Sequence, residues 1–142
     1  MGSGHLSGHL PPPVVLGDLG EGGLAPAIAA IVERGVQRRP DRANRLSLEL
    51  EIRVLGPHPP TRVCFRAGEV LVEDGAAENP AVVLEGTLAD LVAVIASPVT
   101  LAGLPSPATP RGRAALTKLA TRRVRVEGPL WLRRELLALL RI

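Results

Sequence analysis

The chain has 142 residues, of which 46% are apolar, and its formal net charge is +3. This length and apolar content indicate one globular domain with a buried core and exclude a disordered chain. The single cysteine excludes an internal disulfide and a zinc site built from several thiolates. Because the sequence contains no signal peptide and no apolar run of about 18 residues, we predict a cytoplasmic protein.

The N-terminal segment, residues 1–23, is dominated by Gly, Pro and Ser. We expect it to be a flexible lead-in or a cloning remnant, followed by a single domain over residues 24–142. The first helix of that domain is predicted over Leu24–Arg39, where Pro40 follows its end. Apolar side chains recur there at helical spacing, at Ile28, Ile31, Val32 and Val36.

The period of the apolar residues then changes from helical to alternating. Arg45–Val54 alternates strictly and predicts a long strand with one buried face. Val63–Arg66 and Glu69–Glu73 are predicted as two short strands joined by a tight hairpin at Ala67–Gly68, and Ala81–Glu85 as a fourth strand. Because turns join these strands, we expect them to form an antiparallel meander.

The last part of the chain is predicted to be mainly helical. Thr87 and Thr109 suit N-cap positions, and each is expected to start a helix, the first ending at Pro98. Arg122–Glu127 alternates again and predicts a fifth strand, which a long helical crossover would allow to add in parallel. An amphipathic helix over Leu130–Arg141 closes the chain. The predicted class is α+β, a five-stranded, mostly antiparallel sheet covered by helices on one face.

Several of these segments carry a family resemblance. The string FRAGEVLVEDG is followed by PAVVLEGTLADLVAVIASP, then by the basic strand RRVRVEG and a Leu-rich helix. In element order and in these small signals, Leu46–Ile142 resembles the sterol carrier protein type 2 family. The resemblance implies a five-stranded sheet backed by helices, with an apolar tunnel for lipids or sterols and no catalytic signature.

The last helix has more apolar surface than one buried stripe needs, and the excess must face the core, a ligand or a second subunit. Together with the resemblance, this predicts an apolar ligand (a lipid, acyl chain or isoprenoid) in a cavity between sheet and helices. The predicted lining residues are Phe65, Leu88, Leu91, Val92, Ile95, Leu119, Val126, Trp131, Leu132 and Leu136. An ordinary core with a dimer contact is the alternative for the same residues.

Positive charge is concentrated at the C-terminal end, where residues 110–142 carry nine cations and two anions. We considered three interpretations: a solvated surface, an acidic membrane surface, or nucleic acid as the partner. The scarcity of aromatic residues disfavours nucleic acid, which needs stacking side chains or a recognition helix. The predicted membrane-facing residues are Arg122, Arg123, Arg125, Arg133 and Arg134.

No set of residues has the spacing of a catalytic, metal or cofactor site. The glycine-rich stretch at residues 16–23 lacks the lysine of a phosphate loop. Cys64 is expected to point toward solvent or a dimer partner, with no histidine placed to activate it, and His5, His9 and His58 lack predictable partners. We therefore expect no enzyme activity, no metal and no cofactor.

A second hypothesis needs no ligand. In it the chain is an accessory domain that forms a homodimer through its sheet edge or last helix and assists an enzyme of a lipid or quinone pathway.

Overall fold

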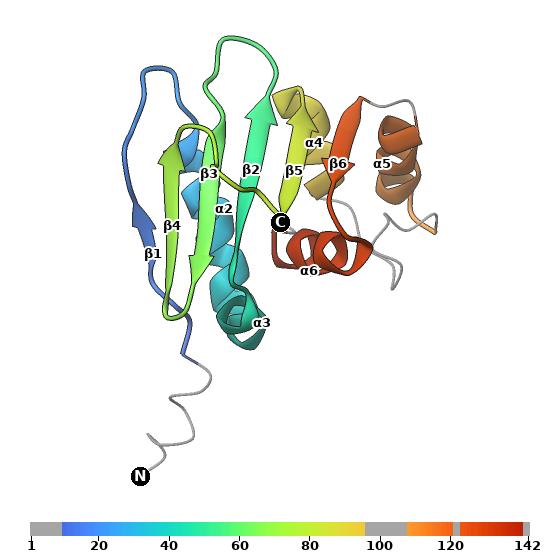
Figure 1. Ribbon diagram of the computed structural model, residues 1–142. Helices are drawn as coiled ribbons and strands as arrows, with labels where there is room; N and C mark the ends of the chain where they lie inside the picture. The colour runs from blue at the N-terminus through green and yellow to red at the C-terminus, as the bar shows by residue number, and fades with distance from the viewer. Residues whose placement is uncertain (1–9, 96–107, 121–122, 141–142) are drawn as a thin grey trace.

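The computed structural model describes residues 10–95, 108–120 and 123–140. It contains a six-stranded sheet in the order β1-β4-β3-β2-β5-β6, with helices packed against one face (Figure 1). The strands are β1 (Val14–Leu16), β2 (Leu48–Val54), β3 (Thr61–Arg66), β4 (Glu69–Asp74), β5 (Val82–Gly86) and β6 (Val124–Glu127). The helices are α2 (Ala25–Arg38), α3 (Pro40–Arg45), α4 (Leu88–Ile95), α5 (Pro110–Ala120) and α6 (Leu130–Leu140).

The predicted α+β class is confirmed, but the expected strand directions were only partly right. β2, β3 and β4 form the expected antiparallel meander. β5 instead lies parallel to β2, because residues 75–81 carry the chain from β4 across the sheet before β5 begins (Figure 1). β6 pairs antiparallel with β5, so the parallel addition expected for the last strand was wrong.

The sixth strand, β1, lies within residues 1–23, where no strand was expected. It pairs parallel with β4. Asp74, at the end of β4, holds the segment that follows β1: its carboxylate accepts hydrogen bonds from the backbone N–H of Gly20 at 2.8 Å and of Ala25 at 3.1 Å. Because Ala25 is the first residue of α2, this carboxylate also compensates unpaired N–H groups at the start of that helix. The sheet therefore has six strands rather than five.

Two helix starts follow the predicted caps, whereas the helix end predicted at Pro98 lies outside the described residues. The hydroxyl oxygen of Thr87 accepts a hydrogen bond from the N–H of Asp90 at 3.2 Å, and that of Thr109 from Gly112 at 2.9 Å. Pro40 was expected only to follow the first helix, but it also begins α3, because proline suits the first helical position.

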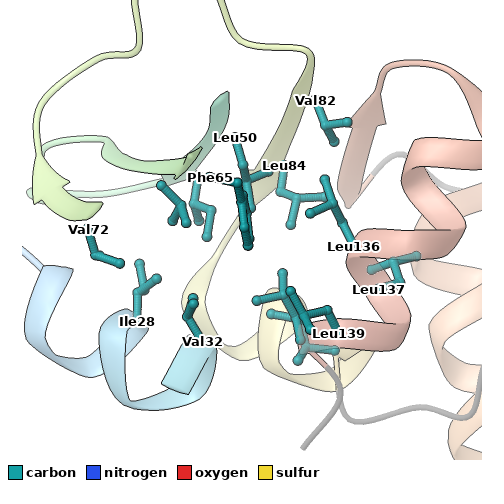
Figure 2. Close-up of a cluster of buried hydrophobic side chains, with 14 of the residues drawn as sticks. Ile28, Val32, Leu50, Phe65, Val72, Val82, Leu84, Leu136, Leu137 and Leu139 are labelled. Atoms are coloured by element: carbon teal, nitrogen blue, oxygen red, sulfur yellow. The ribbon is translucent and has the colours of Figure 1, made fainter. Parts of the chain in front are cut away.

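The core lies between the sheet and the helices α2 and α6. Figure 2 shows Leu50 and Phe65 of the central strands between Ile28 and Val32 of α2 and the leucines of α6. Phe65 is 2% exposed and Leu50 is fully buried. The apolar set predicted from alternation in β2 faces this core, which confirms that one face of the strand is buried.

The opposite sheet face, called the open face below, is covered with charged side chains. Arg62 of β3 lies 3.0 Å from Glu73 of β4 and 3.3 Å from Glu49 of β2. Glu85 of β5 lies 3.7 Å from Arg125 of β6. Neighbouring strands thus place opposite charges across from one another, which favours this strand pairing by a fraction of a kcal/mol for each pair.

Helices α2 and α6 cross at Gly35, where a Cβ atom would overlap the backbone carbonyl of Leu139. In an isolated helix, Gly→Ala stabilises by about 1 kcal/mol. At this crossing we expect Gly35→Ala to lower the free energy of unfolding by about 2 kcal/mol instead, because the methyl group overpacks a rigid backbone. Urea unfolding measures the change.

Gly20→Ala is the matched control, because its Cβ would lie 3.5 Å from the nearest atom, an ordinary contact. We expect that variant to be neutral or slightly more stable. A Gly35→Ala protein as stable as the Gly20→Ala protein would contradict the tight crossing.

Candidate ligand-binding site

The predicted lining residues divide into a buried and an exposed group. The buried group is part of the hydrophobic core, with no member more than 7% exposed: Phe65, Leu91, Ile95, Leu132 and Leu136. The exposed group consists of Leu88, Val92 and Trp131. Val126 is partly buried against the core, and the side chain of Leu119 lies outside the described part of the structure.

Phe65, Leu132 and Leu136 lie in the space between the central strands and helices α2 and α6, and Leu91 and Ile95 join the same core cluster from α4. Phe65 projects from β3 into this space, and Leu136 reaches it from α6 (Figure 2). Val32 of α2 and Leu139 of α6, neither of which was a predicted lining residue, are fully buried in the same cluster. This part of the interior, where the sequence predicts a cavity, holds closely packed apolar side chains.

The exposed group lies on the outer surfaces of α4 and α6. Leu88 and Val92 are one helical turn apart on α4 and are 49% and 39% exposed. Trp131 is 61% exposed, and its neighbour Leu130, which was not among the predicted lining residues, is 54% exposed. Large apolar side chains on helix surfaces of this kind are what an apolar ligand, a membrane or a partner protein contacts.

Helical phase explains why the sequence did not separate these groups. The sequence of α4, LADLVAVI, is apolar nearly all the way round the helix. Leu88, Leu91, Val92 and Ile95 share one stripe of the helix, but Leu91 and Ile95 are buried whereas Leu88 and Val92, at the edge of that stripe, are exposed. The spacing of the apolar residues does not show which edge of the stripe faces solvent.

The predicted basic residues do not act as one set. Arg125 forms its ion pair with Glu85 on the open face, and the Nε of Arg133 donates to the carbonyl oxygen of Gly128 at 2.8 Å. Both side chains thus contribute to contacts within the domain. Arg123 and Arg134 are exposed, and Arg122 lies outside the described residues.

The open face offers polar groups rather than an apolar site. A hollow of about 30 Å³, lined by Arg53, Val83, Glu85, Arg125 and Glu127, has room for water only. Glu51 is 3% exposed and accepts a hydrogen bond at 2.7 Å from the N–H of Ala77, which holds residues 75–81 against this face. A second hydrogen bond to Glu51, from Arg53, raises the pKa of the Arg53 guanidinium above its ordinary value.

Cys64 was expected to point toward solvent or a dimer partner. It does lie on the opposite side of β3 from Phe65, but it is buried, at 7% exposure. Its sulfur accepts a hydrogen bond from the Nε of Arg66 at 3.4 Å. Its cross-strand neighbours on this face are Glu49 of β2 and Leu71 of β4.

Within the described part of the chain, two larger hollows lie away from every predicted site residue. One, of about 300 Å³, lies between Pro11–Val14 and α2. The other, of about 220 Å³, lies at the α2–α3 junction and is lined largely by arginines. The signal for the second is present in the sequence as RRPDRANR, residues 38–45, which carries four arginines and one aspartate.

The division into a buried and an exposed group predicts opposite responses to truncation. We expect Leu136→Ala to lower the free energy of unfolding by about 2–5 kcal/mol, because it leaves a cavity in the core. Trp131→Ala should change it by no more than about 0.5 kcal/mol, because the indole makes few buried contacts. Urea unfolding of both variants measures the difference, and equal losses would show that Trp131 is part of the core.

Comparisons with known proteins show a similarity of fold but not of sequence. No protein-family model and no curated protein sequence matches this chain. A solved structure titled "UbiJ-SCP2 Ubiquinone synthesis protein" superposes with a TM-score of 0.55 and 13% sequence identity, covering 82% of this chain and 89% of that chain. None of the described helices is long and apolar enough to cross a membrane. The chain therefore has a fold similar to that of the sterol carrier protein type 2 domain.

Proposed function

We propose that this chain is a non-catalytic carrier domain that binds an apolar ligand, such as a lipid, an acyl chain or an isoprenoid. The ligand contacts the outer surface of α4 and the first turn of α6. The similarity of fold to a protein titled for ubiquinone synthesis supports an apolar ligand with an isoprenoid tail.

The observation that carries this proposal is the exposure of four large apolar side chains on two helices: Leu88, Val92, Leu130 and Trp131. Each is between 39% and 61% exposed. Full burial of such a side chain is worth about 1.5–3 kcal/mol, so covering the exposed part contributes roughly 1 kcal/mol each. An acyl or prenyl chain laid against these helices would gain that free energy.

An anionic membrane surface is the source and destination that such a carrier needs. Leu130 and Trp131 open α6 and are followed one turn later by the exposed Arg134. Tryptophan favours the boundary between headgroups and acyl chains, and arginine favours anionic headgroups. The first turn of α6 is therefore the proposed membrane contact of this protein, which we expect to be cytoplasmic. Arg123 would supply a further positive charge toward the anionic headgroups.

The burial of five predicted lining residues in the core favours a second candidate function, that of a ligand-free accessory domain. In this alternative the exposed residues of α4 or α6, or a sheet edge, contact a second copy of the chain or a partner enzyme. A complete absence of bound lipid would favour it.

Ligand binding predicts that purified protein carries lipid in native mass spectrometry. It also predicts that oleate shifts the emission of the single tryptophan, Trp131, to shorter wavelength, because the exposed indole becomes covered. We expect the double variant Leu88→Ser/Val92→Ser to weaken oleate binding at least tenfold, since about 2 kcal/mol of apolar burial is lost.

Leu16→Ser/Leu19→Ser is the matched control, because both leucines are exposed but lie in or just after β1. This variant should bind oleate within twofold of the parent protein. A protein without copurifying lipid and without an emission response to oleate would contradict the carrier function, and a dimer in sedimentation analysis would then favour the accessory function.

A further inference from the structure

The junction of α2 and α3 carries a hollow, called the arginine hollow below, of about 220 Å³. It arises because α2 ends at Arg38 and Pro40 starts α3 after a single intervening residue. Arginines on both sides of this sharp junction are thereby brought around one space. The lining residues are Arg38, Arg39, Pro40, Asp41, Arg42 and Arg45.

Two of these arginines are held in place by α6. A terminal nitrogen of Arg38 donates to the carbonyl oxygen of Leu139 at 3.1 Å, and to that of Ala138 at 3.4 Å. The Nε of Arg42 lies 3.3 Å from a carboxylate oxygen of Glu135. These contacts fix the position of both guanidinium groups at the edge of the hollow.

The other two arginines have no such contacts. Arg39 and Arg45 are exposed, and among the described residues neither guanidinium has a hydrogen-bond or ion-pair partner. Four cations and one carboxylate, that of Asp41, thus surround the space. Arg42 is already paired with Glu135, so Arg39 and Arg45 supply the positive charge that a bound anion would neutralise.

We infer that the arginine hollow binds a phosphate-bearing anion. The guanidinium fork matches phosphate oxygens in pairs, which gives both charge and geometry for this ligand class. The volume is below the range of about 300–1,000 Å³ that is usual for drug-sized ligands, and it fits a phosphate or diphosphate group. The anion is either a soluble phosphate compound or the headgroup of a phospholipid. This inference does not depend on the proposed carrier function, because the hollow lies apart from the exposed residues of α4.

Isothermal titration of the full chain with inorganic diphosphate tests the site. We expect saturable binding that weakens as salt increases. Arg39→Gln/Arg45→Gln should raise the Kd at least tenfold. Arg39→Lys/Arg45→Lys, which keeps the charge but removes the fork, should raise it by an intermediate factor.

Arg34→Gln/Arg111→Gln is the matched control, because it removes two exposed cations that do not line the hollow. Its Kd should stay within twofold of the parent value. Failure of the parent protein to bind diphosphate, or equal weakening in both glutamine double variants, would overturn the inference. Unchanged thermal midpoints of all variants establish that each is folded.

Vesicles distinguish the two sources of phosphate. The protein is sedimented with phosphatidate vesicles, and phosphatidylcholine vesicles serve as the reference. A phospholipid headgroup is the ligand if the protein sediments with phosphatidate, if Arg39→Gln/Arg45→Gln abolishes this sedimentation, and if diphosphate prevents it. Binding of diphosphate without sedimentation on phosphatidate supports a soluble anion. Sedimentation that survives the Arg39→Gln/Arg45→Gln change and is unaffected by diphosphate counts against a phospholipid in the hollow.

Discussion

The crossing of α2 and α6 at Gly35 is the contact on which the rest of the structure depends. A glycine there lets the two helix backbones approach, so that the leucines of α6 reach the centre of the sheet. Arg38, one turn further along α2, then donates to the last carbonyls of α6 and fixes its end. Helix α6, of eleven residues, is thereby held against α2, which lies about a hundred residues before it in the sequence.

This crossing also divides α6 into surfaces with different roles. Its inner side carries Leu136 and Leu139 into the core, and its first turn presents Leu130 and Trp131 outward. Its later part positions the arginines of the α2–α3 junction through Glu135 and the backbone carbonyls. The proposed ligand contact and the arginine hollow therefore both depend on one helix, and damage to the crossing would affect both together with the stability of the core.

Much of the fold was predictable because apolar periodicity and caps are local signals. Alternation located the strands from Leu48 to Glu85 within a few residues, and Thr87 and Thr109 marked two helix starts. The parallel pairing of β5 with β2 was not predictable in this way. It depends on where residues 75–81 cross the sheet, and that path is set by a buried side chain of β2, Glu51. β1 was missed because three residues are too few to show a period.

The candidate sites show the same distinction between local pattern and placement in space. Charge counted along the chain pointed to residues 110–142, yet Arg125 is paired with Glu85 and Arg133 with a backbone carbonyl. The four arginines of the α2–α3 junction converge because a proline starts a second helix at once, and two of them keep no partner among the described residues. Since an unpaired cation attracts an anion more strongly than a paired one, the balance of partners rather than the number of cations determines where an anion would bind.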